Sequence, residues 1–490
     1  MRITDLCSGF KHQLIGENVS VNGIAYDSRS VSPGNVFVAI RGYKHDGHHF
    51  IPQAIANGAI AVISDHLVMD LNVPQVICED TRLALALISA KFYHFPANKM
   101  RIIGITGTNG KTTTTYLIKA ILERAGFKVG LVGTIRNLIG SEVVPAKRTT
   151  PESLELQQLL AEMYNNGVQY VVMEVSSHAL ELKRTEGIEF DNVIFTNLTQ
   201  DHLDFHQSIE EYFNAKAKLF ATLKHNGYKK NKFCVINIDD RYGQKLTALS
   251  TAPVASYGIN TNSDFQARNI DITPQGVSYY LTTPSENSFI NLQLTGMFNV
   301  YNSLAAIAAC SMEGIDLITI QAALEKITGV DGRFELVHGG QDFTVIVDYA
   351  HTPDSLENIL KTSRTVSNGR LIAVCGAGGD RDRLKRPLMG EVLASFADYT
   401  IITSDNPRSE DPAAICRDIE QGFLRKVGTQ DVYEIIVDRR MAIKHAIQLA
   451  KKGDIVLIAG KGHETYQEFS KGIVHFDDRE EALKAIKELL

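Results

Sequence analysis

The sequence predicts an α/β protein, and three observations support this fold class. Short apolar runs typical of buried strands recur along the chain, amphipathic stretches lie between them, and polar clusters follow several of the runs. Strand–helix alternation predicts parallel sheets that helices cover on both faces. A length of 490 residues predicts two to four domains. We expect a small N-terminal α/β domain (1–98), a central P-loop ATPase domain with a parallel sheet (99–331), and a C-terminal Rossmann-like α/β domain (332–490).

The expected elements follow from the apolar runs taken in chain order. In the first domain, strands are expected at 36–40 and 60–63. In the second, we expect strands at 101–105, 168–175, 193–195 and 234–236, helices at 152–165 and 208–224, and an antiparallel insertion at 265–294. In the third, strands are expected near 344–348, 371–375, 399–403 and 454–458.

Composition and charge exclude several classes of protein. The net charge of −6 provides no basic stripe, which argues against nucleic acid as a partner and against a membrane surface. The first residues lack an apolar signal core, and no window approaches the roughly 18 apolar residues of a membrane span. The six cysteines are scattered without a Cys-x-x-Cys pair, as in reduced proteins. We therefore expect a soluble, cytoplasmic protein without membrane insertion, and we expect a monomer.

A glycine loop at 104–115 indicates ATP binding, because it lies between an expected strand and a helix N-terminus. Such a loop points backbone N–H groups and the positive end of the helix dipole at a polyphosphate. Lys111 would reach the outer phosphates, and the Thr112 hydroxyl would ligate Mg²⁺. The usual pattern has glycine where this chain has Ile105, so the loop is a variant in which Gly107 supplies the flexibility. The alternative is a glycine-rich turn without a ligand.

Polar clusters follow two further strands of the central domain, where ligands of open α/β sheets bind. Glu174 and His202 in these clusters are candidate second and third Mg²⁺ ligands, although imidazole suits Mg²⁺ less well than oxygen does. A carboxylate at a strand end can instead be a cap or an ion-pair partner. Zinc is a further alternative, because His206, Asp201 and Asp204 lie close to His202 in the sequence.

Four loops of the C-terminal domain also follow apolar strands and precede helical stretches, at 348–353, 375–382, 404–408 and 458–464. Two arginines and a lysine among them form a site for carboxylates or phosphates. Asp, Asn, Gly and Pro also dominate ordinary turns, so turn chemistry alone is the alternative.

Together these motifs resemble the Mur ligase family over essentially the whole chain. The matching positions are 107–113, 174–178, Asn197, Asp201, His202, Lys216, Asn299, Asn302, Arg333 and 348–351. The resemblance implies an ATP-dependent amide-bond ligase of peptidoglycan precursor synthesis, and hence a role in cell wall biogenesis, cell shape and cell division. Such a ligase activates a carboxylate as an acyl phosphate, which an amine then attacks. Residues 26–29 and 405–408 resemble the family members that add meso-diaminopimelate.

The resemblance also implies roles for individual residues. ATP would be bound by Gly107, Thr108, Asn109, Gly110, Lys111, Thr112, Thr113, Asn299, Arg333 and Asp348. The catalytic residues would be Lys111, Glu174, His202 and Lys216. Mg²⁺ would be held by Thr112, Glu174, His202 and a carbamylated Lys216. Carbamylation turns the ammonium into an anion, and the alternatives are an unmodified, solvated Lys216 or carbamylation of Lys218.

The substrates implied by the resemblance are UDP-N-acetylmuramoyl-L-alanyl-D-glutamate and meso-diaminopimelate. The uridine diphosphate end would contact Tyr26, Ser28, Tyr43, Lys44 and His45, and the sugar-peptide would contact Thr149, Thr150, Ser176 and Arg184. The family often has glutamine where this chain has Leu182, which removes one polar contact. The amino-acid pocket would consist of Arg381, Asp405, Asn406, Pro407, Arg408, Gly460 and Glu464.

Several alternatives follow from the same residues. A bidentate arginine such as Arg408 suits the second carboxylate of diaminopimelate, whereas an L-lysine-adding ligase would not need it. A folylpolyglutamate synthase-like ligase would share the ATP machinery but would not need 26–29 or 405–408. Two readings without ligase activity are a P-loop nucleotide switch and an inactive ligase-like scaffold.

Overall fold

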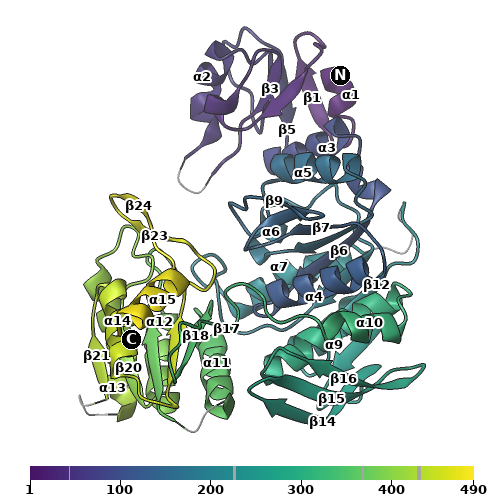
Figure 1. The fold of residues 1–490 in the computed structure, drawn as a ribbon. Helices are drawn as coiled ribbons and strands as arrows, with labels where there is room; N and C mark the ends of the chain where they lie inside the picture. The colour runs from purple at the N-terminus through teal and green to yellow at the C-terminus, as the bar shows by residue number, and fades with distance from the viewer. Residues whose placement is uncertain (43–44, 224–227, 367–368, 428–431, 490) are drawn as a thin grey trace. The chain divides into compact units, whose positions relative to one another are not determined.

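The computed structural model describes residues 1–490 except 43–44, 224–227, 367–368, 428–431 and 490 (Figure 1). Two compact units divide the chain. The first consists of Met1–Gly104, Phe127–Val193 and Lys218–Lys232, and the second of Ile105–Gly126, Ile194–Ala217 and Phe233–Leu490. The three-domain division expected from the sequence stays a prediction. No described helix is both long and apolar enough to cross a lipid bilayer.

A five-stranded sheet forms the N-terminal part of the first unit. Its strand order is β1 (His12–Ile15), β5 (Gln75–Cys78), β4 (Ala61–Ser64), β3 (Asn35–Val38) and β2 (Gly23–Ala25). All neighbours are parallel except β1 and β5. The associated helices are α1 (Ile3–Leu6), α2 (Ile51–Ala56), α3 (Thr81–Phe92) and the 3₁₀ turns η1 (Ser28–Ser30), η2 (Gly47–Phe50) and η3 (Pro96–Lys99). Two buried apolar clusters pack against this sheet, which confirms the α/β prediction for this part of the chain.

The remainder of the first unit is also α/β. Its strands are ordered β10 (Tyr170–Glu174), β7 (Val129–Val132), β8 (Asn137–Ile139) and β9 (Glu142–Val144), with β10 and β7 parallel and the other pairs antiparallel. Its helices are α5 (Ser153–Asn165) and α6 (Ser177–Glu181). Strands β6 (Arg101–Thr106) and β11 (Asn192–Phe195) each have residues in both units. The apolar runs predicted these strands because buried parallel strands are apolar on both faces.

In the second unit, an antiparallel ladder continues a parallel one. Strands β12 (Phe233–Asn237), β13 (Val254–Gly258) and β14 (Phe265–Thr273) pair in parallel, and β15 (Gly276–Thr282) and β16 (Asn287–Leu292) follow antiparallel. The helices are α4 (Lys111–Arg124), α7 (Ile209–Ala221), α8 (Arg241–Leu249), α9 (Met297–Met312) and α10 (Leu317–Leu324), and the last residues of α7 belong to the first unit. This confirms the antiparallel segment expected at 265–294.

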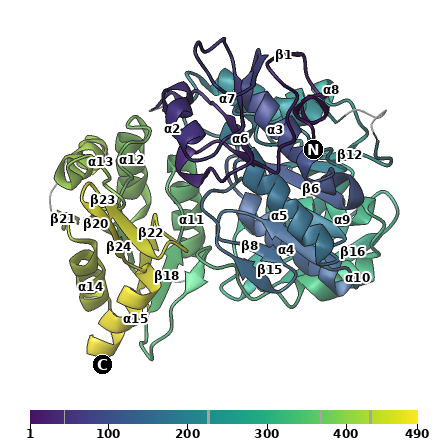
Figure 2. The same cartoon turned by 90° about the horizontal axis from the view of Figure 1, so that it is seen from above.

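The C-terminal part of the second unit is a six-stranded sheet between two layers of helices (Figure 2). The strand order is β17 (Glu335–Leu336), β18 (Thr344–Asp348), β22 (Ile455–Ala459), β19 (Leu371–Cys375), β20 (Tyr399–Ile402) and β21 (Tyr433–Ile435). Only β17 is antiparallel to its neighbour. The helices are α11 (Pro353–Val366), α12 (Lys385–Phe396), α13 (Pro412–Val427), α14 (Arg439–Leu449) and α15 (Asp478–Leu489), and β23 (Tyr466–Phe469) and β24 (Gly472–His475) form a hairpin.

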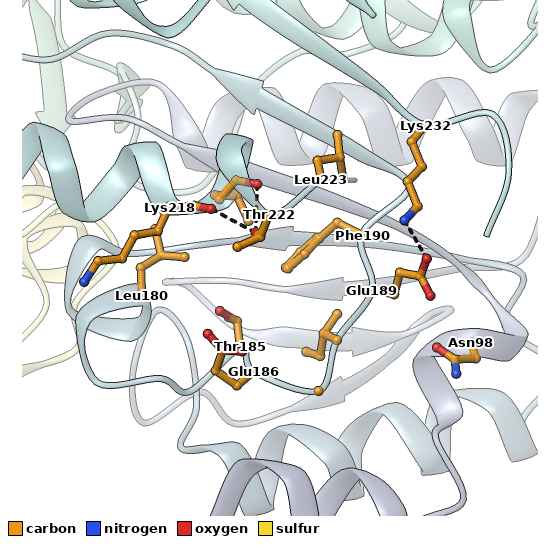
Figure 3. A pocket seen from close by; sticks show the side chains of 13 residues that line it. Asn98, Leu180, Thr185, Glu186, Glu189, Phe190, Lys218, Thr222, Leu223 and Lys232 are labelled. Atoms are coloured by element: carbon orange, nitrogen blue, oxygen red, sulfur yellow. Dashed lines mark hydrogen bonds and ion pairs between the residues drawn. The ribbon is translucent and has the colours of Figure 1, made fainter. Parts of the chain in front are cut away.

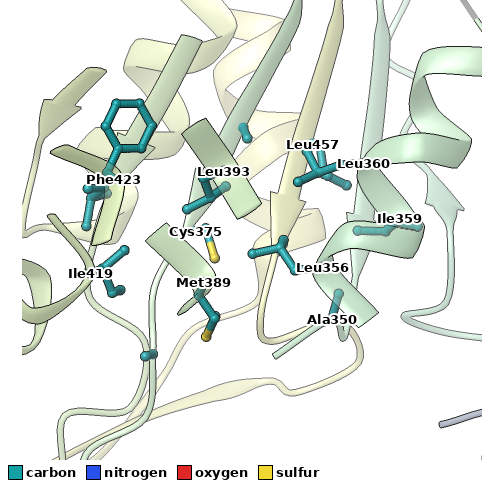
Figure 4. Packing of buried hydrophobic residues seen from close by; sticks show 14 of the residues in the cluster. Ala350, Leu356, Ile359, Leu360, Cys375, Met389, Leu393, Ile419, Phe423 and Leu457 are labelled. Atoms are coloured by element: carbon teal, nitrogen blue, oxygen red, sulfur yellow. The ribbon is translucent and has the colours of Figure 1, made fainter. Parts of the chain in front are cut away.

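Two buried cores fix this sheet from its opposite faces. Leu356 of α11, Met389 of α12 and Phe423 of α13 pack with Leu457 of β22 in the core shown in Figure 4. Helices α14 and α15 contribute to the core on the other face. The four strands expected in this part of the chain are confirmed, each to within one residue.

A buried ion pair joins α14 and α15 to the carboxyl ends of two strands. Arg439 donates to both carboxylate oxygens of Asp478, at 2.8 and 2.7 Å, and both side chains have no exposed area. The same guanidinium donates to the carbonyl oxygens of Ala459 (3.0 Å) and Ser404 (3.4 Å). Asp478 favours the charged form of Arg439 against the cost of burial, and the pKa of Arg439 is raised. The pair therefore positions the strand ends that carry the loops at 404–408 and 460–464.

Asp478→Asn would leave the Arg439 guanidinium buried without its carboxylate. Removing one partner of a buried pair costs about 3–5 kcal/mol, so the urea midpoint followed by far-UV circular dichroism should fall clearly. Glu488→Gln is the matched control, because it breaks the Lys444–Glu488 pair (2.8 Å), which joins the same helices but is about 40 % exposed. The control should leave the midpoint nearly unchanged, and equal shifts for both variants would contradict this role of Asp478.

Candidate functional site

The phosphate loop connects β6 to α4 in a conformation that requires glycine at two positions. Gly107 has φ 150° and Gly110, directly before α4, has φ 84°. A Cβ at Gly107 would lie 1.9 Å from Thr196 Oγ1, and one at Gly110 would lie 2.4 Å from Asn302 Oδ1. The loop is therefore held against its neighbours by its backbone, with the N-terminus of a 14-residue helix at its end. This arrangement presents N–H groups to an anion.

Two lysines converge on one carbonyl oxygen of this loop. Lys111 Nζ lies 3.0 Å from Gly107 O and 2.8 Å from Thr108 O, and Lys216 Nζ donates to the same Gly107 O at 2.9 Å. Lys216 is 1 % exposed. Burial, together with the nearby Lys111 charge, lowers the pKa of Lys216 well below its usual value, although Asp201 acts in the opposite sense. The loop therefore places two lysine side chains close together, and this surrounding favours the neutral form of Lys216.

A cavity of about 250 Å³ lies beside this loop, entirely within the second unit. Its lining combines the loop, α9 and the residues that follow β18. The residues are Asn109, Gly110, Thr113, Thr196, Asn197, Thr199, Asn237, Tyr257, Met297, Phe298, Tyr301, Asn302, Arg333, Asp348, Tyr349, Ala350, His351, Asp354, Ser355, Asn358 and Ile359. Asn109 Nδ2 donates to Asp354 Oδ2 at 2.7 Å, which joins the loop to the start of α11. The mixed apolar and polar lining suits a small ligand with an aromatic ring.

The predicted nucleotide residues of the second unit are brought together around this cavity. The Arg333 guanidinium lies 4.8 Å from the centre of the Tyr349 ring, and its Nη2 donates to Thr112 Oγ1 at 3.0 Å. Asp348 accepts from the backbone N–H groups of Phe334 and Ala350, each at 2.7 Å. Burial raises the pKa of Asp348, and Arg333 opposes this shift.

Asn299 does not line the cavity but supports a residue that does. Its Oδ1 accepts from Asn302 Nδ2 at 3.0 Å, and its own Nδ2 donates to Thr295 O at 2.8 Å. Asn302 in turn faces Gly110. Asn299 therefore acts on the loop through Asn302.

The predicted ligand His202 lies beside a buried carboxylate. Asp201 is 4 % exposed, and His202 Nε2, Lys385 Nζ and His351 Nε2 lie 3.4, 3.6 and 3.9 Å from its oxygens. Burial raises the pKa of Asp201, but these three groups outweigh it and the net shift is downward. The sequence did not single out Lys385, because it lies in a charged stretch without a motif.

Two further features of this segment bear on metal binding. His202 has φ 57°, a strained value for a residue other than glycine, and such strain is concentrated at functional positions. Burial and then Lys385 lower the pKa of His351 to about 4, so this imidazole is neutral near pH 7. Within the described part of the chain, the aspartates and histidines at 201–206 do not assemble three ligand atoms for one metal, so zinc is not supported there.

A second polar cluster lies at the ends of β20 and β22, where the amino-acid pocket was predicted. Lys461 has no exposed area, and its Nζ lies 3.1 Å from Asn406 Oδ1, 3.1 Å from Glu464 Oε2 and 3.5 Å from Asp405 Oδ1. Asn406 Nδ2 also donates to Glu464 at 2.8 Å. A Cβ on Gly460 (φ 120°) would lie 3.0 Å from Asp405 Oδ2.

The two carboxylates of this cluster titrate differently. Burial raises the pKa of Asp405, but Lys461 and then Arg439 outweigh it, so the net shift is downward. Burial and the Asp405 charge raise the pKa of Glu464. Lys461, which lies in one of the four strand-end loops of the sequence, is the cation common to both and was not named among the predicted pocket residues.

Arg408 is oriented by a contact that the sequence did not reveal. Its Nε donates to Glu468 Oε2 at 2.9 Å and its Nη1 donates to Gly379 O at 2.7 Å, and its φ is 52°. A Cβ on Gly378 would lie 3.1 Å from Arg408 Nη1 and 3.6 Å from Arg381 Cγ, so this glycine borders both predicted arginines. Glu468 lies on β23, a short strand without an apolar run, which explains why no motif indicated it. Pro407 is buried in the same loop.

The remaining predicted residues belong to the first unit. Glu174 is 1 % exposed, and its two oxygens accept from the N–H and hydroxyl of Thr134, each at 2.9 Å. Thr149 Oγ1 lies 3.0 Å from Thr134 Oγ1. Thr150 Oγ1 donates to Glu174 O (2.9 Å) and lies 3.4 Å from Ser176 Oγ, which caps α6. These four predicted residues therefore form one connected network in the first unit.

Arg184 belongs to a cluster of three arginines around one buried carboxylate. Its Nε donates to Glu152 Oε2 at 3.2 Å, and Arg82 and Arg148 each have a nitrogen 3.7 Å from the same oxygen. Burial lowers the pKa of Arg184. The cluster carries an excess of positive charge. The sequence indicated only Arg184, because Arg82 and Arg148 lie in segments without a recognisable motif.

The residues predicted for the uridine end lie in the N-terminal part of the first unit. Tyr26 donates to Glu155 at 2.7 Å, and Ser28 Oγ donates to Gln53 Oε1 at 2.9 Å. His45 is exposed and packs edge-on to Phe50. Tyr43 and Lys44 lie outside the described residues.

Lys218, the competing candidate for carbamylation, lines a different cavity. This cavity of about 350 Å³ lies in the first unit between the end of α7 and residues 185–190 (Figure 3). Lys218 Nζ donates to Glu181 at 2.5 Å, and its side chain is about half exposed. Of the two lysines, Lys216 therefore contacts the phosphate loop, whereas Lys218 contacts Glu181.

Three models of one protein family match successive parts of the chain. They are "Mur ligase family, catalytic domain" over 20–93, "Mur ligase middle domain" over 105–310, and "Mur ligase, glutamate ligase domain" over 332–462.

Similar proteins match all or most of the chain. A UDP-N-acetylmuramoyl-L-alanyl-D-glutamate–2,6-diaminopimelate ligase of Caldanaerobacter subterraneus subsp. tengcongensis is 48 % identical over 492 residues, covering 100 % of this chain and 99 % of the relative. A solved structure of a ligase with the same name is 33 % identical, with a TM-score of 0.68 and coverage of 100 % and 99 %. A Mycobacterium tuberculosis folylpolyglutamate synthase, solved with ADP and AMPPCP, is 19 % identical, with a TM-score of 0.65 over 78 % of this chain and 93 % of its own, and shares the fold.

Gly110→Ala tests whether the close packing of the phosphate loop matters for nucleotide binding. The variant combines a positive φ with a collision against Asn302, so binding of a fluorescent ATP analogue should fall at least tenfold. Gly126→Ala is the matched control at the other end of α4, since it has φ 92° but nothing within 4 Å of its Cβ. Both variants incur about 1–2 kcal/mol of backbone strain, but the control should bind the analogue normally. Equal losses would mean that strain in α4, and not the Asn302 contact, governs binding.

Proposed function

Because the chain belongs to the Mur ligase family, we propose that it joins meso-diaminopimelate to UDP-N-acetylmuramoyl-L-alanyl-D-glutamate, with ATP as the energy source. The observation that carries the proposal is the phosphate loop, where Lys111 and Lys216 meet at Gly107 O beside the 250 Å³ cavity. The full-length relative at 48 % identity, which bears the name of such a ligase, supports the choice of substrates.

ATP would bind with its phosphates on the loop and its adenine in the cavity. Residues 107–113 would surround the phosphates with N–H groups and the Lys111 ammonium. The Arg333–Tyr349 stack and Asp348 would contact the base and ribose, with Asn299 acting through Asn302. The cation–π contact between Arg333 and Tyr349 gives the cavity a flat surface that suits an aromatic base.

Mg²⁺ fits the chemistry of the proposed donor set. The Thr112 hydroxyl and the Glu174 carboxylate are the oxygen ligands that Mg²⁺ prefers, while the His202 imidazole is a weaker one. The N–H and hydroxyl of Thr134 each donate to one oxygen of Glu174 and orient this carboxylate. When bound, Mg²⁺ would neutralise the charge of the polyphosphate.

A carbamylated Lys216 explains the lysine pair at Gly107 O. The neutral amine attacks CO₂, forming an N–C bond and releasing a proton, and the product is an anionic carbamate. Burial and the nearby Lys111 charge lower the pKa of Lys216, which favours that neutral amine. The carbamate would also remove the repulsion between Lys216 and Lys111 and would offer oxygen atoms to Mg²⁺.

The reaction proposed for the bound substrates has two steps. A carboxylate oxygen of the glutamate residue attacks the γ-phosphorus of ATP, an acyl phosphate forms and ADP leaves. The amine of diaminopimelate then attacks the acyl carbon, and the tetrahedral intermediate expels phosphate and forms the amide. Lys111 would stabilise the charge on the transferring group, because phosphoryl transfer depends on positioning and neutralisation.

The sugar-peptide and the amino acid would use the two other clusters. Thr149, Thr150, Ser176 and Arg184 would bind the sugar-peptide, and Tyr26, Ser28 and 43–45 would bind the uridine diphosphate end. The residues proposed for diaminopimelate are Arg381, Asp405, Asn406, Pro407, Arg408, Gly460 and Glu464, with Lys461 added. Arg408 would bind the distal carboxylate in place of Glu468, and Glu464 would bind the distal ammonium.

The proposed protein has three domains and is a cytoplasmic monomer. We assign domains at 1–98, 99–331 and 332–490, which the family matches at 20–93, 105–310 and 332–462 support. A monomer in the cytoplasm is proposed, and the six buried cysteines, none in a disulfide, support a reducing environment.

The proposal is tested by phosphate release from ATP with the UDP-sugar-dipeptide, comparing meso-diaminopimelate with L-lysine. Release only with diaminopimelate is expected. Release with lysine alone would keep the ligase but overturn the amino-acid pocket. No release with either amino acid would favour the folylpolyglutamate synthase-like alternative, a nucleotide switch or an inactive scaffold.

Lys216→Ala should abolish turnover, and added acetate or formate should restore part of it by replacing the carbamate anion. Lys218→Ala is the control two positions along the same helix, and its activity should stay near that of the parent chain because Lys218 pairs with Glu181. Steady-state phosphate release with and without the carboxylates measures both. A loss that no carboxylate restores would contradict the carbamate.

Arg408→Ala should raise the KM for diaminopimelate by about tenfold or more while leaving the KM for ATP unchanged. The reason is the loss of a charge-assisted contact to the distal carboxylate, which typically costs on the order of 2–5 kcal/mol when buried. Arg417→Ala, which removes an exposed arginine paired with Asp411 at 3.5 Å, serves as the control. Equal changes in both KM values for Arg408→Ala would assign Arg408 a structural role.

A further inference from the structure

The loops after two neighbouring strands of the N-terminal sheet bring together two histidines and two aspartates. Strands β3 and β4 are parallel, so their carboxyl ends lie at the same edge of the sheet. The segment after β3 supplies Asp46 and His48, and Asp65 and His66 directly follow β4. None of these residues belongs to the ligase site proposed above.

Three of the side chains point potential metal ligands at one another. His66 Nδ1 lies 2.5 Å from Asp65 Oδ1, and His48 Nε2 lies 3.3 Å from the same oxygen. The three ligand atoms of His48, Asp65 and His66 all lie within 4.8 Å of one another. The two imidazole rings are 4.5 Å apart. Tetrahedral ligands at about 2.0–2.2 Å from a Zn²⁺ ion lie roughly 3.3–3.6 Å apart. The spacing of His48 Nε2 and the Asp65 oxygen fits this value, whereas His66 Nδ1 would have to move away from that oxygen on binding.

His48 provides an independent indication of a ligand. Its side chain is 7 % exposed, and among the described residues its Nε2 is buried without a hydrogen-bond partner. Its Nδ1 lies 2.6 Å from Asp46 Oδ1, and its own backbone N–H donates to that oxygen. With Nδ1 directed at Asp46, Nε2 is the ring nitrogen that faces the Asp65 oxygen, and a cation bound by both atoms would satisfy them.

The surrounding charges suit a divalent ion. Asp46 holds His48 through Nδ1 as the outer carboxylate of a carboxylate–histidine–metal arrangement does. Arg41 Nε lies 2.8 Å from Asp65 Oδ2 and Nη2 lies 3.2 Å from Oδ1. Arg41 thus engages mainly the oxygen that faces away from the histidines. The two carboxylates outweigh this one guanidinium, which leaves a net negative site.

We propose that His48, Asp65 and His66 bind one divalent transition-metal ion, with Zn²⁺ as the best fit and Asp46 as the residue that positions His48. Two imidazoles and one carboxylate match the donor preference of Zn²⁺ and exclude Mg²⁺. The ion would cross-link the segments that follow β3 and β4. None of these residues is among those proposed above for the ligase substrates, and the proposal does not depend on ligase activity.

The test is metal binding by the full, untagged chain in buffer without nucleotide. Titration with Co²⁺, followed by its visible absorption, and calorimetric titration with Zn²⁺ should each show one equivalent of tight binding. Saturating Zn²⁺ should raise the melting temperature of the parent chain. His66→Ala should reduce Zn²⁺ affinity at least a hundredfold, and since His66 is half exposed, this variant should fold normally.

Two further variants separate a metal site from a simple hydrogen-bonded cluster. Asp46→Asn should weaken Zn²⁺ binding by about tenfold to a hundredfold, as loss of a positioning carboxylate does. His49→Ala is the matched control, because His49 neighbours His48 but is exposed and outside the cluster. It should bind like the parent chain. The proposal is overturned if the parent chain does not bind, or if His66→Ala binds as tightly as His49→Ala.

Discussion

The meeting of two lysines at one carbonyl oxygen is the constraint around which the second unit is organised. Lys111 and Lys216 both donate to Gly107 O, and Lys111 also donates to Thr108 O. Two ammonium groups so close repel each other, and burial adds to the cost for Lys216. An anion would relieve this conflict, and the polyphosphate and the Lys216 carbamate proposed above are both anions. Without a bound anion, the two nearby lysine side chains therefore cost electrostatic energy.

Buried charged groups also lie close together at other strand ends of the second unit. Asp201 is surrounded by His202, Lys385 and His351, and Asp405 is balanced chiefly by Lys461 and Arg439. Lys385, Lys461 and Arg439 are thus held beside buried carboxylates that other elements carry. Because a buried charge without a partner is expensive, these clusters cannot move independently of the strands that carry them. The Arg439–Asp478 pair extends this coupling to α14 and α15.

The sequence predicted the parts of the fold that depend on apolar runs. Strands β18 and β19 have the expected bounds because their residues are almost entirely buried. Strands β17, β21 and β24 were not predicted, since they are two to four residues long and mostly exposed. The phosphate loop was indicated by local spacing, whereas Lys385, Lys461 and Glu468 act through partners distant in the chain. No local pattern encodes such pairs, so contacts like Arg408 to Glu468 had to come from the structure.

The contact between Arg408 and Glu468 bears on the amino-acid preference of the proposed ligase. Arg408 already has a carboxylate partner, so diaminopimelate exchanges one carboxylate for another. Glu468 is 38 % exposed, and pairs with such a partner are typically worth less than about 1 kcal/mol, so little is lost in the exchange. A carboxylate that becomes buried on binding gains more from the same guanidinium. L-lysine offers no such exchange and leaves Arg408 with Glu468. Under the proposed function, selectivity therefore depends on how completely bound diaminopimelate excludes water from Arg408, and not on the arginine alone.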